Sequence, residues 1–273
     1  MYLGIDVGGT KTMVAKLSND GKIIASRRFP SSKDYQLFLQ DLDEIIKSLD
    51  LEGTYHCCAG IAGLLDRKTG VVQALGNLPW RDKPIRDDIS KLIGGQSVLI
   101  ENDARLAGLS EARLIKDKYI SVLFATISTG IGGAFVQNGQ LVTALQDMEM
   151  GKMPLQFNGE FINWEEFAGG RGVVKRFNKK AAEITDPAVW KIIGENIAYG
   201  LGATCAVLQP DAIILGGGVG AFADNFSKTI LDFFAKHLHP VIKQPQAILA
   251  AQRPDEAVIF GCYDLAKHGQ NKV

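Results

Sequence analysis

Apolar and polar positions at the start of the chain predict three short strands. An apolar run covers 2–7, and Met13, Ala15 and Leu17 fall on one face of the stretch 12–18. Asn19-Asp20-Gly21 is then a typical hairpin turn before another strand at 22–28. We therefore expect an antiparallel meander over the first 28 residues.

A helical period follows the meander. Between 34 and 49 the apolar residues share one helix face, and these are Leu37, Phe38, Leu42, Ile45, Ile46 and Leu49. The same patterns predict helices at 88–93, 102–114, 163–182, 187–208, 220–237 and 256–267. They predict further strands at 55–61, 71–75, 97–100, 119–128, 134–136 and 212–215. Strands and helices therefore alternate, as in the α/β class.

The order strand, glycine turn, strand occurs twice along the chain. The first instance surrounds Gly8-Gly9, and the second follows the apolar run 119–128. A repeat of this kind predicts two related α/β lobes that face each other across a cleft, where ligands of such folds bind. We expect the lobes to be 1–115 and 116–255, with a closing helix in 256–273 packed on the first lobe.

Composition excludes several classes of protein. Thirty basic and 30 acidic side chains give a formal net charge of zero, which argues against nucleic acid or an anionic membrane as the main partner. No signal peptide is recognisable, and no apolar run reaches the ~20 residues of a membrane span. The cysteines (Cys57, Cys58, Cys205, Cys262) form no Cys-x-x-Cys pair and are expected to be buried thiols. These features predict a cytoplasmic protein.

The first glycine turn has the composition of a phosphate-binding segment. Its candidate ligands are Asp6, Gly8, Gly9, Thr10 and Lys11. Bare N–H groups of paired glycines can bind an anion, and the carboxylate can position a metal ion. Thr10 interrupts the Gly-Lys order of a Walker A loop, and a strand rather than a helix follows. A phosphate clamp of the actin and hexokinase type and an ordinary tight turn both stay open.

Two later glycine segments have similar composition. Ser128, Thr129, Gly130 and Gly132 offer hydroxyl and N–H groups at a strand end, as a second jaw of such a clamp would. Gly216-Gly217-Gly218 ends an apolar strand, where glycines permit the close approach of a flat ligand or simply of another backbone segment.

Acidic residues supply the candidate catalytic groups. Asn102 and Asp103 follow a strand and begin a helix, so each is a natural helix cap. Beside phosphate-binding turns, Asp103 is also a candidate general base for a sugar hydroxyl. Glu149 and Glu165 are either solvated or accept hydrogen bonds from a polyhydroxylated ligand.

Taken in chain order, these segments resemble the ROK family of sugar kinases, in the actin-like ATPase superfamily. The matching segments are Gly4–Lys11, Ala59–Asp66, Asn77–Trp80, Glu101–Ala104, Ser128–Gly133, Leu208–Gly218 and Phe260–Cys262. Ala62 and Leu64 replace prolines usual in the family, and Ser128 replaces a glycine. The resemblance implies two actin-like (ribonuclease H-like) lobes with mixed sheets flanked by helices.

The resemblance also implies an activity and roles for residues. The protein would be an ATP-dependent, glucokinase-like hexose kinase acting on a sugar 6-hydroxyl, with Asp103 as base. Its implied sugar ligands are Gly63, Asn77, Asn102, Asp103, Glu149, Lys152 and Glu165. The three glycine segments would bind ATP, and Asp6 would hold Mg²⁺ through phosphate or water. A hexose or N-acetylhexosamine is the implied substrate, and a homodimer the implied assembly.

Two departures from the family pattern change these expectations. Lys152 occupies the position of a usual histidine, and the stretch 153–163 contains no cysteine or histidine, so we expect no structural zinc. Lys152 could pair with Glu149, donate to a sugar hydroxyl, or be solvated.

Two alternatives to an ATP-dependent kinase stay open, and a third, a repressor, is not favoured. Polyphosphate could replace ATP, and Lys179-Lys180 hint at the basic groove that this donor would need. The protein could bind sugar without catalysis. A sugar-sensing repressor of the same family would need a DNA-binding domain ahead of the first turn, which begins at Gly4.

Overall fold

The structure, a computed structural model that describes residues 1–51 and 53–268, contains two five-stranded sheets. The chain divides into two units. The first contains Met1–Ser110 and the described residues from Asp255 onward, and the second is Glu111–Pro254. The sequence placed this division near residue 115.

The first sheet belongs to the first unit and has the order β3-β2-β1-β4-β8. Its strands are β1 (Tyr2–Val7), β2 (Lys11–Leu17), β3 (Ile23–Pro30), β4 (His56–Ile61) and β8 (Val98–Asn102). The first three are antiparallel, as the meander predicted, while β4 and β8 run parallel to β1. Register pairs Asp6 with Gly60 and Gly60 with Glu101, so the ends of three parallel strands meet at one edge.

The second sheet repeats this topology in the second unit, with the order β11-β10-β9-β14-β15. Its strands are β9 (Ser121–Ile127), β10 (Ile131–Gln137), β11 (Gln140–Leu141), β14 (Ala212–Gly216) and β15 (Ala247–Ala250). Again three strands are antiparallel and two are parallel to the first of them. The repeat predicted from the two glycine turns is therefore present in the sheets.

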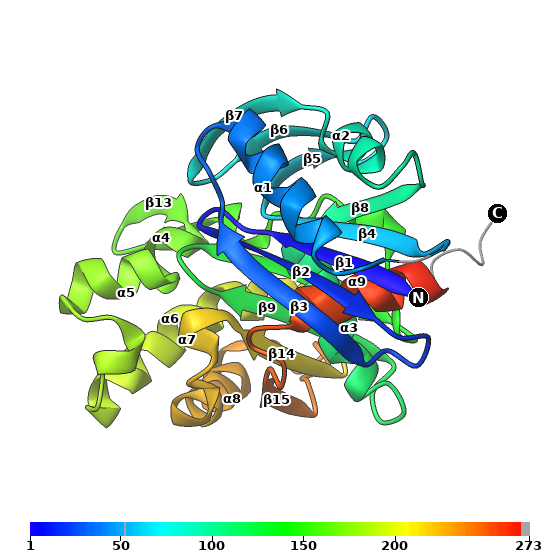
Figure 1. Ribbon diagram of the computed structural model, residues 1–273. Coiled ribbons are helices and arrows are strands. Elements are labelled where there is room, and N and C mark those ends of the chain that lie inside the picture. Colours follow the sequence, from blue (N-terminus) through cyan, green and yellow to red (C-terminus); the bar gives the residue numbers. More distant parts are fainter. Residues whose placement is uncertain (52, 269–273) are drawn as a thin grey trace. The chain divides into compact units, whose positions relative to one another are not determined.

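Helices cover these sheets through amphipathic faces. In the first unit they are α1 (Tyr35–Lys47), α2 (Ile85–Leu92), the start of α3 (Asp103–Leu114) and α9 (Ala257–His268). Helix α1 begins where the Asp34 carboxylate accepts the N–H groups of Gln36 and Leu37. Helix α9 runs beside β1 (Figure 1), with Ile259 and Tyr263 packed against apolar residues of β2.

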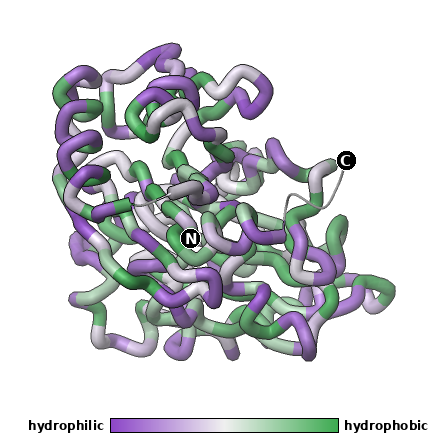
Figure 2. The backbone as a smooth tube through the Cα atoms, turned by 45° about the vertical axis from the view of Figure 1, so that its right-hand side comes forward, coloured by the Kyte–Doolittle hydropathy of each residue, from purple (hydrophilic) through white to green (hydrophobic). Residues whose placement is uncertain are grey.

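The second unit is also rich in helices. They are α4 (Trp164–Ala168), α5 (Gly170–Phe177), α6 (Pro187–Leu208), α7 (Gly217–Gly220) and α8 (Ser227–His237), with single 3-10 turns at 143–145, 150–152, 181–183 and 223–225. Along the whole backbone, hydrophobic stretches alternate with hydrophilic ones, as Figure 2 shows. Among the described residues, no helix is both long enough and apolar enough to cross a lipid bilayer.

Most strands of two small sheets were not predicted from the sequence. The strands β5 (Gly63–Asp66), β6 (Val71–Leu75) and β7 (Leu78–Lys83) form one of them, and only β6 was expected. The other is a hairpin of β12 (Pro154–Phe157) and β13 (Glu160–Asn163), with Asn158 at φ 52° in its turn. These strands are short and irregular, so their sequences carry little periodicity.

Three predicted helices are wrong in extent. The helix expected at 163–182 is broken at Gly169, whose extended backbone separates α4 from α5, and α5 ends at Asn178 in the left-handed region. The helix expected at 220–237 begins only at Ser227, because Phe226 has non-helical torsion angles. The short helix expected at 88–93 starts three residues earlier, at Ile85.

Candidate active site

The first glycine turn joins β1 to β2, as the sequence predicted. The Gly8 N–H donates to the Lys11 carbonyl at 3.2 Å, which closes the turn. Gly9 lies against Asn77, which stands between β6 and β7; a Cβ atom at Gly9 would be 3.2 Å from that of Asn77. The turn, which includes Thr10 and Lys11, therefore lies next to Asn77 in the first unit.

Asp6 lies at the end of β1, directly before this turn. Burial and, to a smaller extent, the nearby charge of Asp103 raise the pKa of its carboxyl to about 7, against the opposing charges of Lys11 and Arg28. Two carboxylates close enough to repel each other are thus brought together from β1 and the start of α3. Oxygen ligands of this kind suit Mg²⁺, whose charge would remove the repulsion. The residues therefore fit the metal that the family implies.

Asn102 and Asp103 begin α3, and both cap it. The Asn102 side-chain oxygen accepts the Arg105 N–H at 3.2 Å, and Asp103 Oδ1 accepts the Ala104 N–H at 2.8 Å. The capping interpretation of the sequence is therefore correct for both residues. It does not exclude chemistry at Asp103, because a carboxylate has further lone pairs to offer.

A buried ion network lies next to the Asn102-Asp103 pair, and the sequence analysis missed most of it. Glu101 is 7% exposed; its Oε1 accepts the Arg67 Nε–H at 2.7 Å and the Asn102 N–H at 2.7 Å. Its other oxygen lies 3.2 Å from Arg105 Nε. The only sequence signal was the spacing of Glu101 and Arg105, four residues apart. The network fixes the backbone that carries Asn102.

The second glycine turn joins β9 to β10 in the second unit. Two of its carbonyl groups hold the start of α5. Ser128 O accepts the Gly170 N–H at 2.6 Å, and Thr129 O accepts the Arg171 N–H at 3.2 Å. A side chain at Gly130 would meet the Glu165 carboxylate, which would have to move away from the turn. The turn is thus packed directly against α4 and α5.

Gly217 brings the third glycine segment to the second turn. Its φ is 80°, and a Cβ atom there would lie 2.6 Å from the Ile127 carbonyl oxygen. Only glycine combines this torsion angle with this approach. Gly216 ends β14 and Gly218 belongs to α7, so two of the three segments that the resemblance assigns to ATP are neighbours.

Lys152 pairs with Glu165 and not with Glu149, which was one of the alternatives left open. The Lys152 ammonium contacts Glu165 Oε1, and Glu165 Oε2 accepts the Ile131 N–H at 3.2 Å. Both carboxylate oxygens are therefore held beside the second glycine turn. Glu149 precedes the 3-10 turn that carries Lys152 and is exposed.

A cavity of about 880 Å³ opens beside this turn. Its lining combines apolar, hydroxyl and basic side chains with glycines, namely Ser128, Thr129, Gly170, Arg171, Val174, Lys175, Lys180, Ala181, Ala182, Gly218 and Val219. A smaller cavity of about 200 Å³ is lined by Thr129, Glu165, Glu166, Arg171 and Lys175. The larger volume suits a nucleotide-sized ligand.

The described residues include no evident site for a structural metal ion. Within 1–51 and 53–268, no group of three or more His, Cys, Asp or Glu residues is placed to hold a metal ion. The four cysteines are buried free thiols, as expected. The absence of zinc stays a prediction.

Comparison with known proteins supports the resemblance. A family model described as ROK family matches residues 2–269. The N-acetyl-D-glucosamine kinase of Vibrio atlanticus is 34% identical over 96% of this chain and 98% of its own. The glucokinase of Halalkalibacterium halodurans is 26% identical over 100% of this chain and 96% of its own.

A solved structure shows the fold. A ROK family glucokinase from Streptomyces griseus, in complex with glucose and AMPPNP, superposes with a TM-score of 0.79 at 23% identity, covering 98% of this chain and 99% of its own. This similarity confirms the predicted α/β class with actin-like units.

Proposed function

This chain belongs to the ROK family, and we propose that it is an ATP-dependent sugar kinase that phosphorylates a hydroxyl group of a hexose or N-acetylhexosamine. The 6-hydroxyl is the position that the resemblance implies. The observation that carries the proposal is the proximity of Asp6 and Asp103 at the edge of the first sheet, beside the first glycine turn.

Asp103 is the general base in this proposal. Its carboxylate accepts the proton of the sugar hydroxyl while that oxygen forms a bond to the γ-phosphorus of ATP. The bond between this phosphorus and the β,γ-bridging oxygen breaks, and ADP leaves. The Glu101 network supports the role by holding the strand end from which Asp103 projects.

The remaining residues bind and orient. Asn102, Asn77, Gly63, Glu149, Lys152 and Glu165 are proposed sugar ligands. The glycine segments at 8–11, 128–132 and 216–218 are proposed to bind ATP. Asp6 would hold Mg²⁺ through phosphate or water, and the ion supplies neutralisation of the charge on the phosphate oxygens.

A coupled assay for ADP release tests the proposal. Glucose, fructose, N-acetylglucosamine and N-acetylmannosamine are compared as acceptors, and sugar phosphate formation is followed separately with ATP and with linear polyphosphate. We expect ATP-dependent turnover with at least one sugar. Turnover with polyphosphate but not with ATP would show that polyphosphate is the donor. Sugar binding without any turnover would show that the protein binds sugar and does not catalyse its phosphorylation.

Location and assembly are parts of the same proposal. We expect a cytoplasmic protein, without nucleic acid or membrane as a partner, that forms a homodimer. Size-exclusion chromatography with light scattering measures the assembly directly.

A further inference from the structure

Helix α5 presents two basic side chains to the cavities beside the second glycine turn. Arg171 and Lys175 are four residues apart, so they lie on the same helix face. Both line the larger cavity, and both line the smaller one as well. Thr129 is the third residue common to the two cavities. Thr129, Arg171 and Lys175 therefore lie where the two cavities adjoin, and we call these three residues the shared wall.

The lining of the larger cavity consists of two chemically different sets of side chains. Val174, Ala181, Ala182 and Val219 give it an apolar part, which suits the flat face of a base. The shared wall gives it a part with a hydroxyl group and two cations, which suits phosphate oxygens. A ligand with a base at one end and an anionic chain at the other matches both parts.

The positive charge of the shared wall is not neutralised by the acidic residues nearest to it. Glu165 is already held by Lys152 and by the Ile131 N–H. Glu166 accepts the Asn163 N–H at 3.3 Å and belongs to the cap of α4. Among the residues that the structure describes, neither Arg171 nor Lys175 has a side-chain ion pair. Both cations are therefore available to a ligand.

We propose that Arg171 and Lys175 bind the phosphate chain of the phosphoryl donor, a nucleoside triphosphate whose base occupies the apolar part of the larger cavity. This inference rests on the proposed kinase function for the identity of the donor, and it adds two residues that the motifs did not suggest. Arg171 and Lys175 form charge-assisted hydrogen bonds to phosphate oxygens, while Thr129 provides a hydroxyl and its backbone.

Equilibrium binding of adenosine, AMP, ADP and AMPPNP tests the proposal without requiring turnover. Arg171→Gln and Lys175→Gln should each weaken AMPPNP binding about tenfold, the loss of one charge-assisted hydrogen bond. Adenosine binding should not change, and the loss should grow with the number of phosphates. This dependence on phosphate number is a readout that a merely structural role would not produce.

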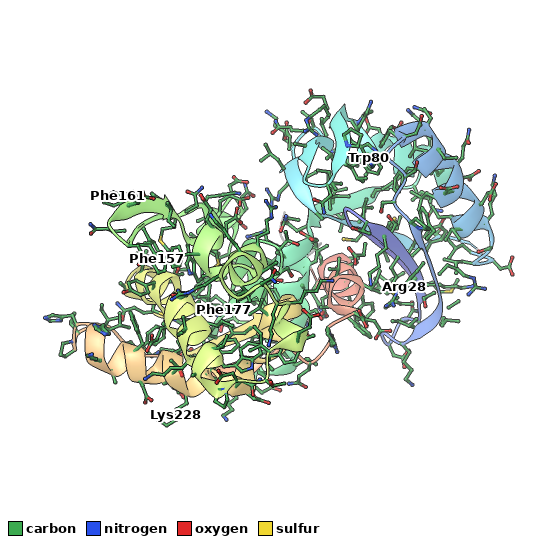
Figure 3. All side chains as sticks on the ribbon, turned by 90° about the vertical axis from the view of Figure 1, so that its left-hand side faces the viewer. Arg28, Trp80, Phe157, Phe161, Phe177 and Lys228 are labelled. Carbon is green, nitrogen blue, oxygen red and sulfur yellow. The ribbon has the colours of Figure 1, made fainter. Side chains whose placement is uncertain are left out.

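Arg176→Gln is the matched control. Arg176 lies on the same helix but stacks over the Phe177 ring at 5.5 Å and lines neither cavity, and Figure 3 shows Phe177 on this helix. The control should bind every nucleotide as the unmodified protein does. Equal losses for adenosine and AMPPNP, or no loss at all, would overturn the proposal.

Linear polyphosphate serves as a second anionic probe that has no base. If the two variants lose polyphosphate binding but keep their affinity for AMPPNP, the shared wall serves polyphosphate and the assignment to a nucleotide is wrong. A protein that binds AMPPNP through both cations but phosphorylates no sugar would refute the proposed kinase function and leave this inference standing.

Discussion

Single residues near the first glycine turn combine structural and chemical roles. Asp103 caps the backbone of α3 through Oδ1, and its charge helps to raise the pKa of Asp6 to about 7. The sequence could predict Asp103, because the Asn-Asp pair begins a helix after a strand. It could not predict Arg67, whose role depends on a loop fold that brings it to Glu101.

Asp103→Asn should separate the two roles. Asparagine caps a helix about as well as aspartate, so the thermal unfolding temperature should change little. Turnover should fall by about 10²–10⁴-fold, because the amide cannot accept the hydroxyl proton. Steady-state kinetics and thermal unfolding measure these effects.

Asp34→Asn is the control for this change. Asp34 caps α1 with its carboxylate and has no proposed role in the reaction, so this variant should keep both stability and turnover. Normal turnover of Asp103→Asn would leave Asp103 with the capping role alone.

The raised pKa of Asp6 predicts opposite effects of pH on stability and on activity. In the unfolded chain this carboxyl ionises near its ordinary pKa of 3.8, but in the folded protein it ionises near 7. The folded state binds the proton more tightly, so stability falls as pH rises from about 4 to about 7. Activity should rise over the upper part of the same interval, because the carboxylate form of Asp6 is the one proposed to hold Mg²⁺.

Asp6→Asn should remove this contribution to the pH dependence. We expect the free energy of unfolding at pH 8 to rise by roughly 1–3 kcal/mol, while the activity is lost. At pH 4 most of the gain should disappear, because Asp6 is then neutral in the folded state and pH 4 lies close to its pKa of 3.8 in the unfolded chain. Urea unfolding at the two pH values measures the difference; an equal gain at both would contradict the assignment.

Lys152 is expected to influence which sugar is used. An ammonium group only donates hydrogen bonds, whereas a histidine can also accept one, so Lys152→His should change the ratio of kcat/KM for glucose and N-acetylmannosamine by about tenfold. Lys228→His is a suitable control, because Lys228 forms an exposed ion pair with Asp232 on α8. Equal changes in kcat/KM for both sugars would show that Lys152 does not determine which sugar is preferred.

At the scale of elements, the hairpin β12–β13 connects Lys152 to Glu165 along the chain. Phe157 anchors it, with its ring stacked on Phe167 at 4.1 Å and perpendicular to Tyr199 at 6.3 Å. The sequence predicted α6 with its observed bounds because its caps and period agree. It did not predict this hairpin, whose stability depends on aromatic contacts with α4 and α6.

Phe157→Ala should destabilise the second unit by roughly 1–3 kcal/mol through loss of these ring contacts. It should also raise the KM for sugar more than the KM for ATP, if the hairpin positions Lys152 and Glu165. Phe161→Ala on the partner strand is the control, since Phe161 is 75% exposed (Figure 3) and its loss should be neutral. Urea unfolding and steady-state kinetics compare the two variants.

The stretch 153–163, which contains this hairpin, has no cysteine or histidine, so we expect no structural zinc. Elemental analysis of protein purified without added metal should find no stoichiometric zinc. Treatment with EDTA should leave the unfolding temperature unchanged but stop turnover, because the donor phosphates need Mg²⁺. One tightly bound zinc ion per chain would contradict the prediction.

At the scale of the whole molecule, the two sheets share one topology although their sequences differ. The sequence predicted this duplication from two glycine turns that each join strand to strand. It did not predict β15, because residues 247–250 are only half-buried and too few to show a period. It also did not predict the strand orders, since pairing between distant strands depends on packing and not on local pattern.

The path of the chain through the two units has a consequence for folding during synthesis. The second unit is continuous in sequence, so all of its strands are available once Pro254 has been made. The first unit is not complete at that stage, because α9 comes later and covers an apolar face formed by Met13, Ala15 and Leu17. Until the ribosome has released 257–268, this face stays open to water and to other nascent chains. A ribosome that stalls before 257–268 has emerged would therefore leave a chain prone to aggregation, and chaperones would have to protect the face formed by Met13, Ala15 and Leu17 until then.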